Sequence, residues 1–342
     1  MDADRLRCIV LAARPQGPPK LEDFRLEEHP IPSAADGGVL LRVRYISLDP
    51  YMRGRMDDRK SYVPAVSLGA VMPAESIAEV IVAHHPDYAK GDLVVARTGW
   101  CSHAALPAAG LRKLTNTSVP VTTALGVLGM PGFTAYAGMR VIGQPKAGET
   151  VVVAAATGPV GSLVGQLARA AGARAVGIAG GAEKCTYALR EFGFDAALDH
   201  REPNLPERLA AVCPQGIDVY FENVGGAIWQ AVLPLLNKFA RVPVCGLIAQ
   251  YNSVEPEGGR NALAATMRAI LTRSLTVRGF INYDFAEHYP DFLREVGAGV
   301  AAGRIRYRED IVEGLARAPQ AFIGMLTGRN FGKLLVRVTP DA

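Results

Sequence analysis

The feature that most constrains the fold is a regular alternation of short apolar runs and amphipathic segments in the middle of the chain. Residues 151–155 are wholly apolar, as expected of a parallel strand buried on both faces. In the segment that follows, apolar residues recur at three- and four-residue spacing, which indicates one face of a helix. Gly172 comes directly after this helix, where a helix-terminating glycine belongs.

The same alternation continues for about 130 residues. Further strands are predicted at residues 175–179, 196–198, 218–222, 241–245 and 275–280, and helices at 205–212, 227–236, 262–271 and 285–302. Six strands that alternate with helices predict an α/β fold, a doubly wound parallel sheet of the Rossmann type. Pro243 lies inside one predicted strand, where it cannot donate to the ladder.

The ends of the chain have a different pattern. Short β-rich pieces at residues 39–45, 78–82 and 92–96 are separated by Pro, Gly and Asp, with little helical period. Residues 332–338 alternate in the same way and are expected to return to this β-rich part. We therefore predict a β-rich domain of residues 1–128 plus 312–342, interrupted by a parallel-sheet domain of residues 129–311.

Composition excludes several classes of protein. The chain has 342 residues, long enough for two domains, and its 37 basic and 33 acidic residues are scattered. This balance does not favour nucleic acid or membrane as a partner. Five dispersed cysteines do not suggest a disulfide framework or a cysteine zinc site. The charged start lacks a signal-like apolar run, so we expect a cytoplasmic protein.

A glycine-containing turn joins the first apolar run to its helix. It consists of Thr157, Gly158, Pro159, Val160 and Gly161. Glycine lets the backbone approach a pyrophosphate closely, and the helix N-terminus offers unpaired N–H groups with a partial positive charge. The strand, turn, helix and second strand in order predict dinucleotide binding. The alternative is a tight strand–helix connection without a ligand.

The end of the second predicted strand indicates which nucleotide is bound. An NAD site usually has a carboxylate there, whereas this chain has Gly180 and Gly181, followed by Glu183 and Lys184. The glycines leave room for a 2′-phosphate, to which Lys184 and Arg201 can supply positive charge. Each charge-assisted bond contributes about 1.5–3 kcal/mol, so we predict NADPH over NADH by roughly tenfold to a hundredfold. The alternative is that Lys184 is a solvated helix residue.

Six short motifs, in order, resemble the medium-chain dehydrogenase/reductase superfamily. They are residues 48–53, 129–136, 155–161, 217–226, 244–252 and 330–333. Together they are similar to the zinc-free alkenal/one reductases, the branch of prostaglandin reductases and bacterial NADPH-dependent curcumin reductases. The resemblance implies a Rossmann domain inserted in a GroES-like β domain, a homodimer, and NADPH-dependent reduction of the C=C bond of α,β-unsaturated ketones and aldehydes.

The sequence offers no catalytic zinc site at the positions that the resemblance points to. Zinc-dependent relatives carry Cys-x-His near the place of Ser47 to Asp49, and Gly-His-Glu near Glu75. In this chain Leu48 lies between Ser47 and Asp49, and Pro73 lies two residues before Glu75, so neither motif is present. A catalytic zinc needs about three Cys, His or carboxylate ligands. We therefore expect no metal, and conjugate reduction does not require one.

Tyr251 is the catalytic residue that the resemblance implies. It follows the fifth predicted strand, where the carboxyl end of a parallel sheet meets a cofactor. A hydride added to the β-carbon of an enone leaves negative charge on the carbonyl oxygen, which needs a donor. Tyr251 would be that donor, with the cofactor ribose hydroxyl as its companion. The alternative is a turn tyrosine that packs at the domain interface.

The resemblance also implies further binding residues. The substrate would contact Tyr51, Met130 and Tyr283, and the cofactor would contact Asn223, Gly246, Tyr251, Phe280, Ile281 and Asn330 in addition to the residues named above. Tyr51 could equally be pocket wall, and Asn330 a turn residue before Gly332. The chain departs from its mammalian relatives at His200-Arg201, where they have Tyr-Lys, and a histidine contact to phosphate would depend on pH.

Two other functions fit the same residues. A quinone reductase would use the same cofactor groove, and nothing in Tyr51, Met130 or Tyr251 excludes a quinone. A crystallin-like protein would bind the nucleotide without useful turnover. Retention of Tyr251 and of the phosphate turn favours an enzyme that acts on small lipophilic enones, alkenals or quinones.

Overall fold

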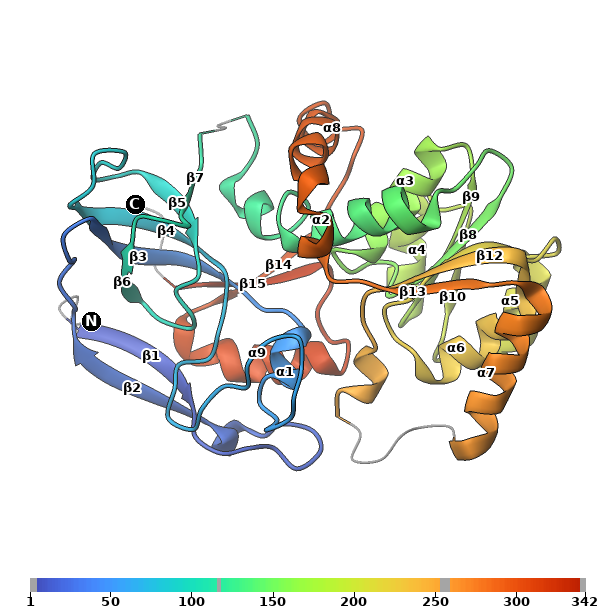
Figure 1. Cartoon of the computed structure of the whole chain (residues 1–342), viewed down its shortest axis with the longest axis horizontal. Helices are drawn as coiled ribbons and strands as arrows, with labels where there is room; N and C mark the ends of the chain where they lie inside the picture. Colours follow the sequence, from blue (N-terminus) through green and yellow to red (C-terminus); the bar gives the residue numbers. More distant parts are fainter. Residues whose placement is uncertain (1–4, 116–117, 253–258, 339–342) are drawn as a thin grey trace. The chain divides into compact units, whose positions relative to one another are not determined.

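A computed structural model describes residues 5–115, 118–252 and 259–338 (Figure 1). The chain divides into two compact units, residues 1–126 with 309–342, and residues 127–308. The second unit is continuous in sequence, whereas the first is built from both ends of the chain.

The second unit contains a six-stranded sheet in the order β10-β9-β8-β11-β12-β13, and every pair in it is parallel. Its strands are β8 (Thr150–Ala154), β9 (Arg174–Ala179), β10 (Ala196–Asp199), β11 (Ile217–Phe221), β12 (Leu236–Val244) and β13 (Thr276–Gly279). Numbered from β8, the order is 3-2-1-4-5-6, so the predicted doubly wound sheet is confirmed. The chain reverses direction across the sheet between β8 and β11.

Helices cover both faces of this sheet. They are α2 (Met130–Ala137), α3 (Gly161–Ala170), α4 (Ala182–Arg190), α5 (Leu205–Val212), α6 (Gly226–Val232), α7 (Gly259–Arg273) and α8 (Tyr289–Ala301). Alternate strand residues such as Val152, Val176 and Tyr220 form one core with α5, α6 and α7. Figure 1 shows α6 and α7 on one side of the strands and α3 on the other. A sheet buried on both faces explains why its strands are apolar at consecutive positions.

Three details differ from the predicted elements. The first strand ends at Ala154, because Ala155 has a left-handed backbone with φ 52°. The fifth strand begins at Leu236, and its bulge around Phe239, with φ 64° and an exposed ring, hides the strand pattern. Pro243 does lie within this strand, and its carbonyl accepts from the Glu222 amide at 2.9 Å. The last predicted helix of this unit begins as a 3-10 helix, η6 (Asn282–His288).

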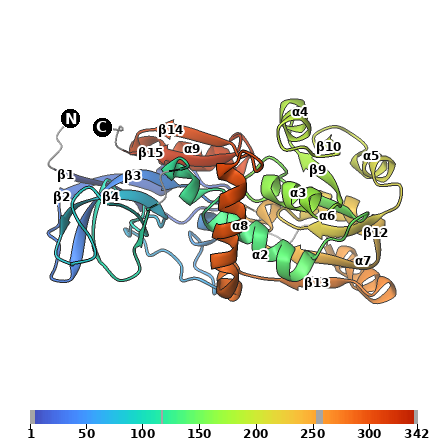
Figure 2. The same cartoon turned by 90° about the horizontal axis from the view of Figure 1, so that it is seen from above.

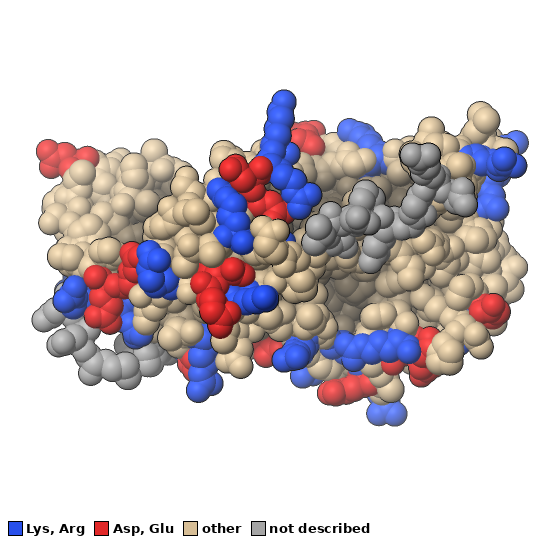
Figure 3. All heavy atoms as spheres, turned by 90° about the horizontal axis from the view of Figure 1, so that it is seen from below, with Lys and Arg blue, Asp and Glu red and all other residues tan. Residues whose placement is uncertain are grey.

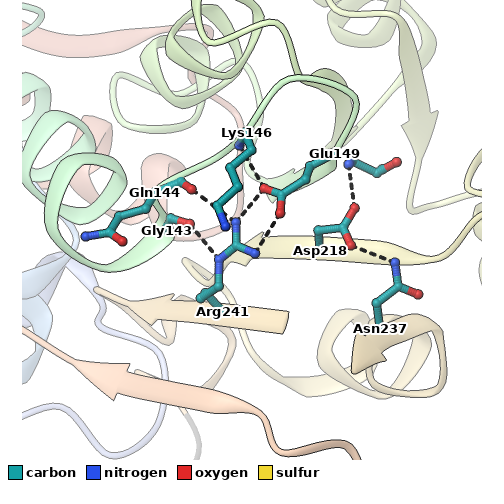
Figure 4. A network of polar contacts seen from close by, with 8 residues as sticks. Gly143, Gln144, Lys146, Glu149, Asp218, Asn237 and Arg241 are labelled. Carbon is teal, nitrogen blue, oxygen red and sulfur yellow. Dashed lines mark hydrogen bonds and ion pairs between the residues drawn. The ribbon is translucent and has the colours of Figure 1, made fainter. Parts of the chain in front are cut away.

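A polar network closes the amino end of the sheet (Figure 4). The Arg241 guanidinium donates to the Gly143 carbonyl at 2.9 Å and binds the Glu149 carboxylate at 2.5 Å. Asp218 accepts from the Thr150 amide and from the Asn237 side-chain amide, both at 2.8 Å. The starts of β8, β11 and β12 are therefore tied together at the end of the sheet opposite to the carboxyl edge.

The first unit is mostly antiparallel. A seven-stranded sheet has the path β14-β15-β3-β4-β5-β7, with β6 on β3, beside a two-stranded sheet of β1 and β2. The strands are β1 (Arg5–Leu11), β2 (Phe24–Pro30), β3 (Gly38–Ser47), β4 (Ser76–Ala83), β5 (Leu93–Ala96), β6 (His103–Pro107), β7 (Arg112–Lys113), β14 (Glu309–Glu313) and β15 (Lys333–Arg337), with helices α1 (Tyr51–Gly54) and α9 (Ala318–Leu326). Figure 2 shows the C-terminal strands beside β3, so the predicted return of the chain end to the β-rich part is confirmed.

The core of this unit is aromatic at its centre. The Trp100 ring stacks on Phe24 with centroids 5.6 Å apart and meets Phe322 edge-on at the same distance. Phe322 belongs to α9, so the end of the chain contributes a ring as well as two strands. These contacts make the N-terminal and C-terminal segments one cooperative core.

The surface carries both signs of charge. Figure 3 shows basic and acidic side chains interspersed on the face it draws, without a continuous basic stripe among the described residues there. Within residues 5–115, 118–252 and 259–338, every helix is too short or too polar to cross a bilayer.

Candidate active site

The turn between β8 and α3 leaves several backbone donors unused. In the described part of the chain, the N–H groups of Val160 and Gly161 donate to no acceptor, and they lie at the N-terminus of a ten-residue helix. A Cβ at Gly161 would lie 2.4 Å from the Ala155 carbonyl oxygen, so only glycine fits there. Thr157 is buried, and Gly158 and Pro159 complete the turn. Such an N-terminus is suited to an anion.

A third glycine, which the sequence analysis did not single out, sets the distance between helix and sheet. A Cβ on Gly165 of α3 would lie 2.1 Å from the Phe194 ring. Gly177 of β9 faces the same ring, which would lie 3.1 Å from a Cβ at that position. Close packing of a helix on a strand is the role of the third glycine in dinucleotide-binding turns. The position of Gly165, four residues after Gly161, is the sequence signal that could have predicted this contact.

Two glycines at the end of β9 make room for Arg201. A Cβ at Gly180 would lie 3.2 Å from the Arg201 guanidinium, and one at Gly181 would lie 3.7 Å from it. The Asp199 carboxylate, at the end of β10, accepts from the Gly181 and Arg201 amides, both at 2.9 Å. Burial alone would raise the Asp199 pKa, but these amide bonds and the nearby positive charges hold that pKa below its ordinary value.

Positive charge gathers around this glycine pair. Burial, followed by the charges of Arg201 and Lys184, lowers the pKa of His200. No described carboxylate forms an ion pair with the exposed Arg201 guanidinium. His200 is therefore neutral near pH 7, and Arg201 and Lys184 are the two permanent cations that an anionic group at this turn would meet.

The end of β11 lies at the reversal point of the sheet. The Asn223 side chain donates to the Ala154 carbonyl at 2.8 Å and accepts from the Cys245 thiol at 2.9 Å, so it links three strand ends. Glu222, which the sequence analysis missed, is buried and accepts from the Val224 amide at 2.7 Å. Burial raises the pKa of Glu222, and these hydrogen bonds oppose that rise. The Glu222 carboxylate therefore shapes the turn that follows Asn223.

The Tyr251 phenol folds back over the end of β12. A Cβ at Gly246 would lie 3.4 Å from the Tyr251 hydroxyl oxygen and 3.4 Å from the Asn223 carbonyl oxygen. The Tyr251 amide donates to the Ile248 carbonyl at 3.3 Å and ends the short helix η5 (Ile248–Gln250). The structure thus brings Tyr251, Gly246 and Asn223 together at the carboxyl edge of the sheet, where ligands of such sheets bind.

After β13 most backbone groups are already paired. The Phe280 amide donates to the Val244 carbonyl at 3.2 Å, and the Ile281 amide donates to the Asp284 carboxylate at 2.9 Å. The Ile281 carbonyl accepts from the Asp284 amide. The Phe280 ring is buried against Phe221. Within the described residues, the Phe280 carbonyl accepts no hydrogen bond, so it is one backbone group here that is open to a ligand.

Two predicted substrate residues come from packed elements of the second unit. Met130 begins α2 and is half-buried, and Tyr283 of η6 is exposed. The helix α2 packs against η6. The two residues therefore come from elements that are in contact with each other.

Tyr51 begins α1, within the first unit. Burial, together with the nearby Asp49 and Glu75 carboxylates, raises the pKa of the Tyr51 phenol, which keeps its proton. Lys333 is buried, and its ammonium donates to Asp49 at 2.6 Å and to the Leu48 carbonyl at 2.9 Å. Asp49, at a position where zinc-dependent relatives carry a ligand, is thus engaged in an ion pair.

Asn330 lies in the same unit as Tyr51. Its side-chain amide donates to the Gly332 carbonyl at 2.8 Å, which holds the turn before β15. This contact is the one expected of a turn residue, and it uses the side-chain nitrogen of Asn330 rather than its side-chain oxygen.

The parallel sheet in this strand order, with an anion-binding turn at its reversal point, defines a nucleotide-dependent oxidoreductase with an additional β-rich unit. The family described as "N-terminal domain of oxidoreductase" matches residues 7–114, and the family described as "Zinc-binding dehydrogenase" matches residues 159–298. The chain belongs to the medium-chain dehydrogenase/reductase superfamily, in its zinc-free branch.

Individual relatives cover nearly the whole chain. The NADPH-dependent curcumin reductase of Escherichia coli is 50% identical over 338 residues, which are 98% of each chain. The NADP-dependent 2-alkenal reductase of Nicotiana tabacum is 39% identical over 97% of each chain. The crystal structure of CurA in complex with NADPH, from Vibrio vulnificus, has a TM-score of 0.94 and 47% identity, covering 98% of this chain and 100% of that one.

Proposed function

We propose that this protein is an NADPH-dependent reductase of the C=C bond of α,β-unsaturated ketones and aldehydes. The observation that carries the proposal is the position of the Tyr251 hydroxyl over Gly246, at the carboxyl edge of a parallel sheet. The relatives described as curcumin, 2-alkenal and prostaglandin reductases support it.

The residues around the sheet suit the parts of NADPH. The unpaired Val160 and Gly161 amides would hold the pyrophosphate, with Thr157, Gly158 and Pro159 shaping the turn. Arg201 and Lys184 would hold the 2′-phosphate beside Gly181. At the other end, the Phe280 carbonyl would accept from the nicotinamide amide. Asn223, Gly246, Ile281 and Asn330 would line this end of the groove.

When bound, NADPH supplies the hydride that adds to the β-carbon of the enone. Negative charge then develops on the carbonyl oxygen, and the Tyr251 hydroxyl would donate a hydrogen bond to it, together with the cofactor ribose hydroxyl. A preorganised donor of this kind lowers the barrier without a metal ion. Tyr51, Met130 and Tyr283 would contact the substrate, and their largely apolar side chains suit lipophilic enones.

A kinetic comparison of substrates tests this function. Purified protein is mixed with NADPH or NADH and a medium-chain enone, its saturated ketone, or a quinone. We expect oxidation with NADPH and the enone, with the saturated ketone as product. Turnover of the quinone alone would instead identify a quinone reductase, and tight NADPH binding without turnover would identify a binding protein.

Two wider proposals accompany this function. The strand β13 is exposed along its length and lies at the edge of the sheet, so we place a homodimer contact there. The five cysteines are all free thiols, which suits the reducing cytoplasm.

A further inference from the structure

Three potential metal ligands share one face of the β1–β2 ribbon. Cys8 of β1 pairs with Glu27 of β2, and His29 lies two positions beyond Glu27, so the three side chains point to the same face. Cys8 also pairs with Cys101 through an isolated antiparallel bridge on its other side. Residues that are 93 positions apart in sequence (101 − 8) are thus cross-strand neighbours.

The ligand atoms of this group are close together. The Cys8 sulfur, a Glu27 carboxylate oxygen and a His29 ring nitrogen all lie within 4.8 Å of one another. Glu27 Oε2 and His29 Nε2 are 3.1 Å apart. Cys101 packs with Cys8 in one buried cluster beside this group. Two ligands on a tetrahedral zinc ion, with bonds of about 2.0–2.3 Å, are separated by roughly 3.3–3.8 Å, so small side-chain rotations suffice.

We propose that Cys8, Glu27 and His29 form a binding site for a thiophilic divalent cation such as Zn²⁺. Thiolate, imidazole and carboxylate are the ligand types that zinc prefers in proteins, and a solvent molecule would complete the four ligands of a tetrahedral ion. This site consists of other residues than the zinc-ligand positions near Asp49, and it does not depend on the proposed reductase activity.

Burial is graded across the site, which gives the cation a route of entry. The Cys8 and Cys101 thiols are buried, Glu27 is a quarter exposed, and His29 is half exposed. Arg25 binds the other carboxylate oxygen of Glu27 at 2.5 Å, which leaves Oε2 directed at His29. A partner of this kind orients a ligating carboxylate, and its positive charge offsets part of the negative charge of Cys8 and Glu27.

Metal titration of the full chain tests the site. Reduced, metal-free protein is titrated with Zn²⁺ against a chelating dye, and with Co²⁺, whose thiolate charge-transfer band reports bound sulfur. We expect one equivalent per chain and the thiolate band. Cys8→Ser should weaken binding by more than about 100-fold, while the buried Cys213→Ser, in the other unit, should leave binding unchanged.

A second variant covers the case in which Cys8→Ser does not fold. His29→Asn changes a half-exposed side chain and should weaken Zn²⁺ binding at least about tenfold. The proposal is overturned by a lack of saturable binding, by Co²⁺ binding without the thiolate band, or by equal affinity in both cysteine variants. It is also overturned if the denatured protein as isolated has two thiols fewer than its five cysteines because Cys8 and Cys101 form a disulfide.

Discussion

At the scale of single residues, glycines leave the space that the groups of the proposed chemistry occupy. Gly246 leaves space for the Tyr251 hydroxyl, and Gly180 leaves space for the Arg201 guanidinium. The residue types at the strand ends could be predicted from sequence. The contacts of Asp199 and Glu222 could not, because their partners are set by which strands become neighbours and by the turns that follow them.

Tyr251→Phe removes the proposed donor and keeps the ring. We expect turnover of an enone to fall on the order of 10²-fold, less than for loss of a sole oxyanion donor, because the ribose hydroxyl would remain. NADPH affinity should be nearly unchanged. Steady-state kinetics and fluorescence titration measure both, with the exposed Tyr62→Phe as control. An unchanged turnover number would remove Tyr251 from the mechanism.

Arg201→Ala removes a permanent cation from the turn after β9. The KM for NADPH should rise by roughly tenfold to a hundredfold, the equivalent of one charge-assisted hydrogen bond, and the KM for NADH should not change. The exposed Arg304→Ala, in the same unit, is the matched control. An equal rise for both cofactors would place Arg201 away from the 2′-phosphate.

At the scale of elements, buried strands were easier to predict from the sequence than exposed strands. The strands β8, β9 and β11 are buried at nearly every position, and their apolar runs made them predictable from sequence. The strands β2 and β14 were not, because β2 is largely exposed and polar, and β14 is short with charged residues at both ends. The start of β12 could not be predicted from the sequence, because the bulge changes the residue period of the strand there.

Gly165→Ala tests the spacing between α3 and the sheet. The added methyl would meet the Phe194 ring, so we expect a loss of about 1–3 kcal/mol in the free energy of unfolding, measured with urea. Phe194→Leu in the same chain should restore part of this loss. The control is Gly297→Ala in α8, where a Cβ meets nothing within 4 Å, and which should stabilise the helix by about 0.5–1 kcal/mol. Equal effects would contradict the packing role.

Lys333→Met tests the ion pair that joins β15 to the end of β3. Asp49 would be left as an unpaired buried carboxylate, so the free energy of unfolding should fall by about 3–5 kcal/mol. Adding Asp49→Leu should recover much of this loss. The Lys113–Asp92 pair has the same 2.6 Å distance but is exposed, and Lys113→Met should cost less than about 1 kcal/mol. A similar cost for both lysines would argue against the burial effect.

At the scale of the whole molecule, the second unit exposes apolar side chains beside an unpaired sheet edge. Leu263, Met267 and Leu271 follow one another at four-residue spacing on α7, and each is more than half exposed. The next strand is the exposed β13. An apolar stripe beside a strand with open hydrogen-bonding groups is suited to a second copy of the chain.

Leu271→Glu should weaken the proposed dimer. A buried interface leucine contributes about 2 kcal/mol, so the dimer dissociation constant should rise roughly 30-fold. Sedimentation equilibrium measures the change, and Leu189→Glu, on the exposed side of α4, is the control. Identical dissociation constants for the two variants would move the dimer contact to another surface.

The pairing of β3 with β15 has a consequence for the order of events during synthesis. The Lys333 ammonium and the Leu48 carbonyl are hydrogen-bonded across 285 positions. The continuous second unit can fold as soon as it leaves the ribosome, because it needs no later residue. The first unit must wait, with one edge of β3 open, until β15 has been translated. Nascent chains of this protein should therefore be most in need of chaperones just before β15 leaves the ribosome.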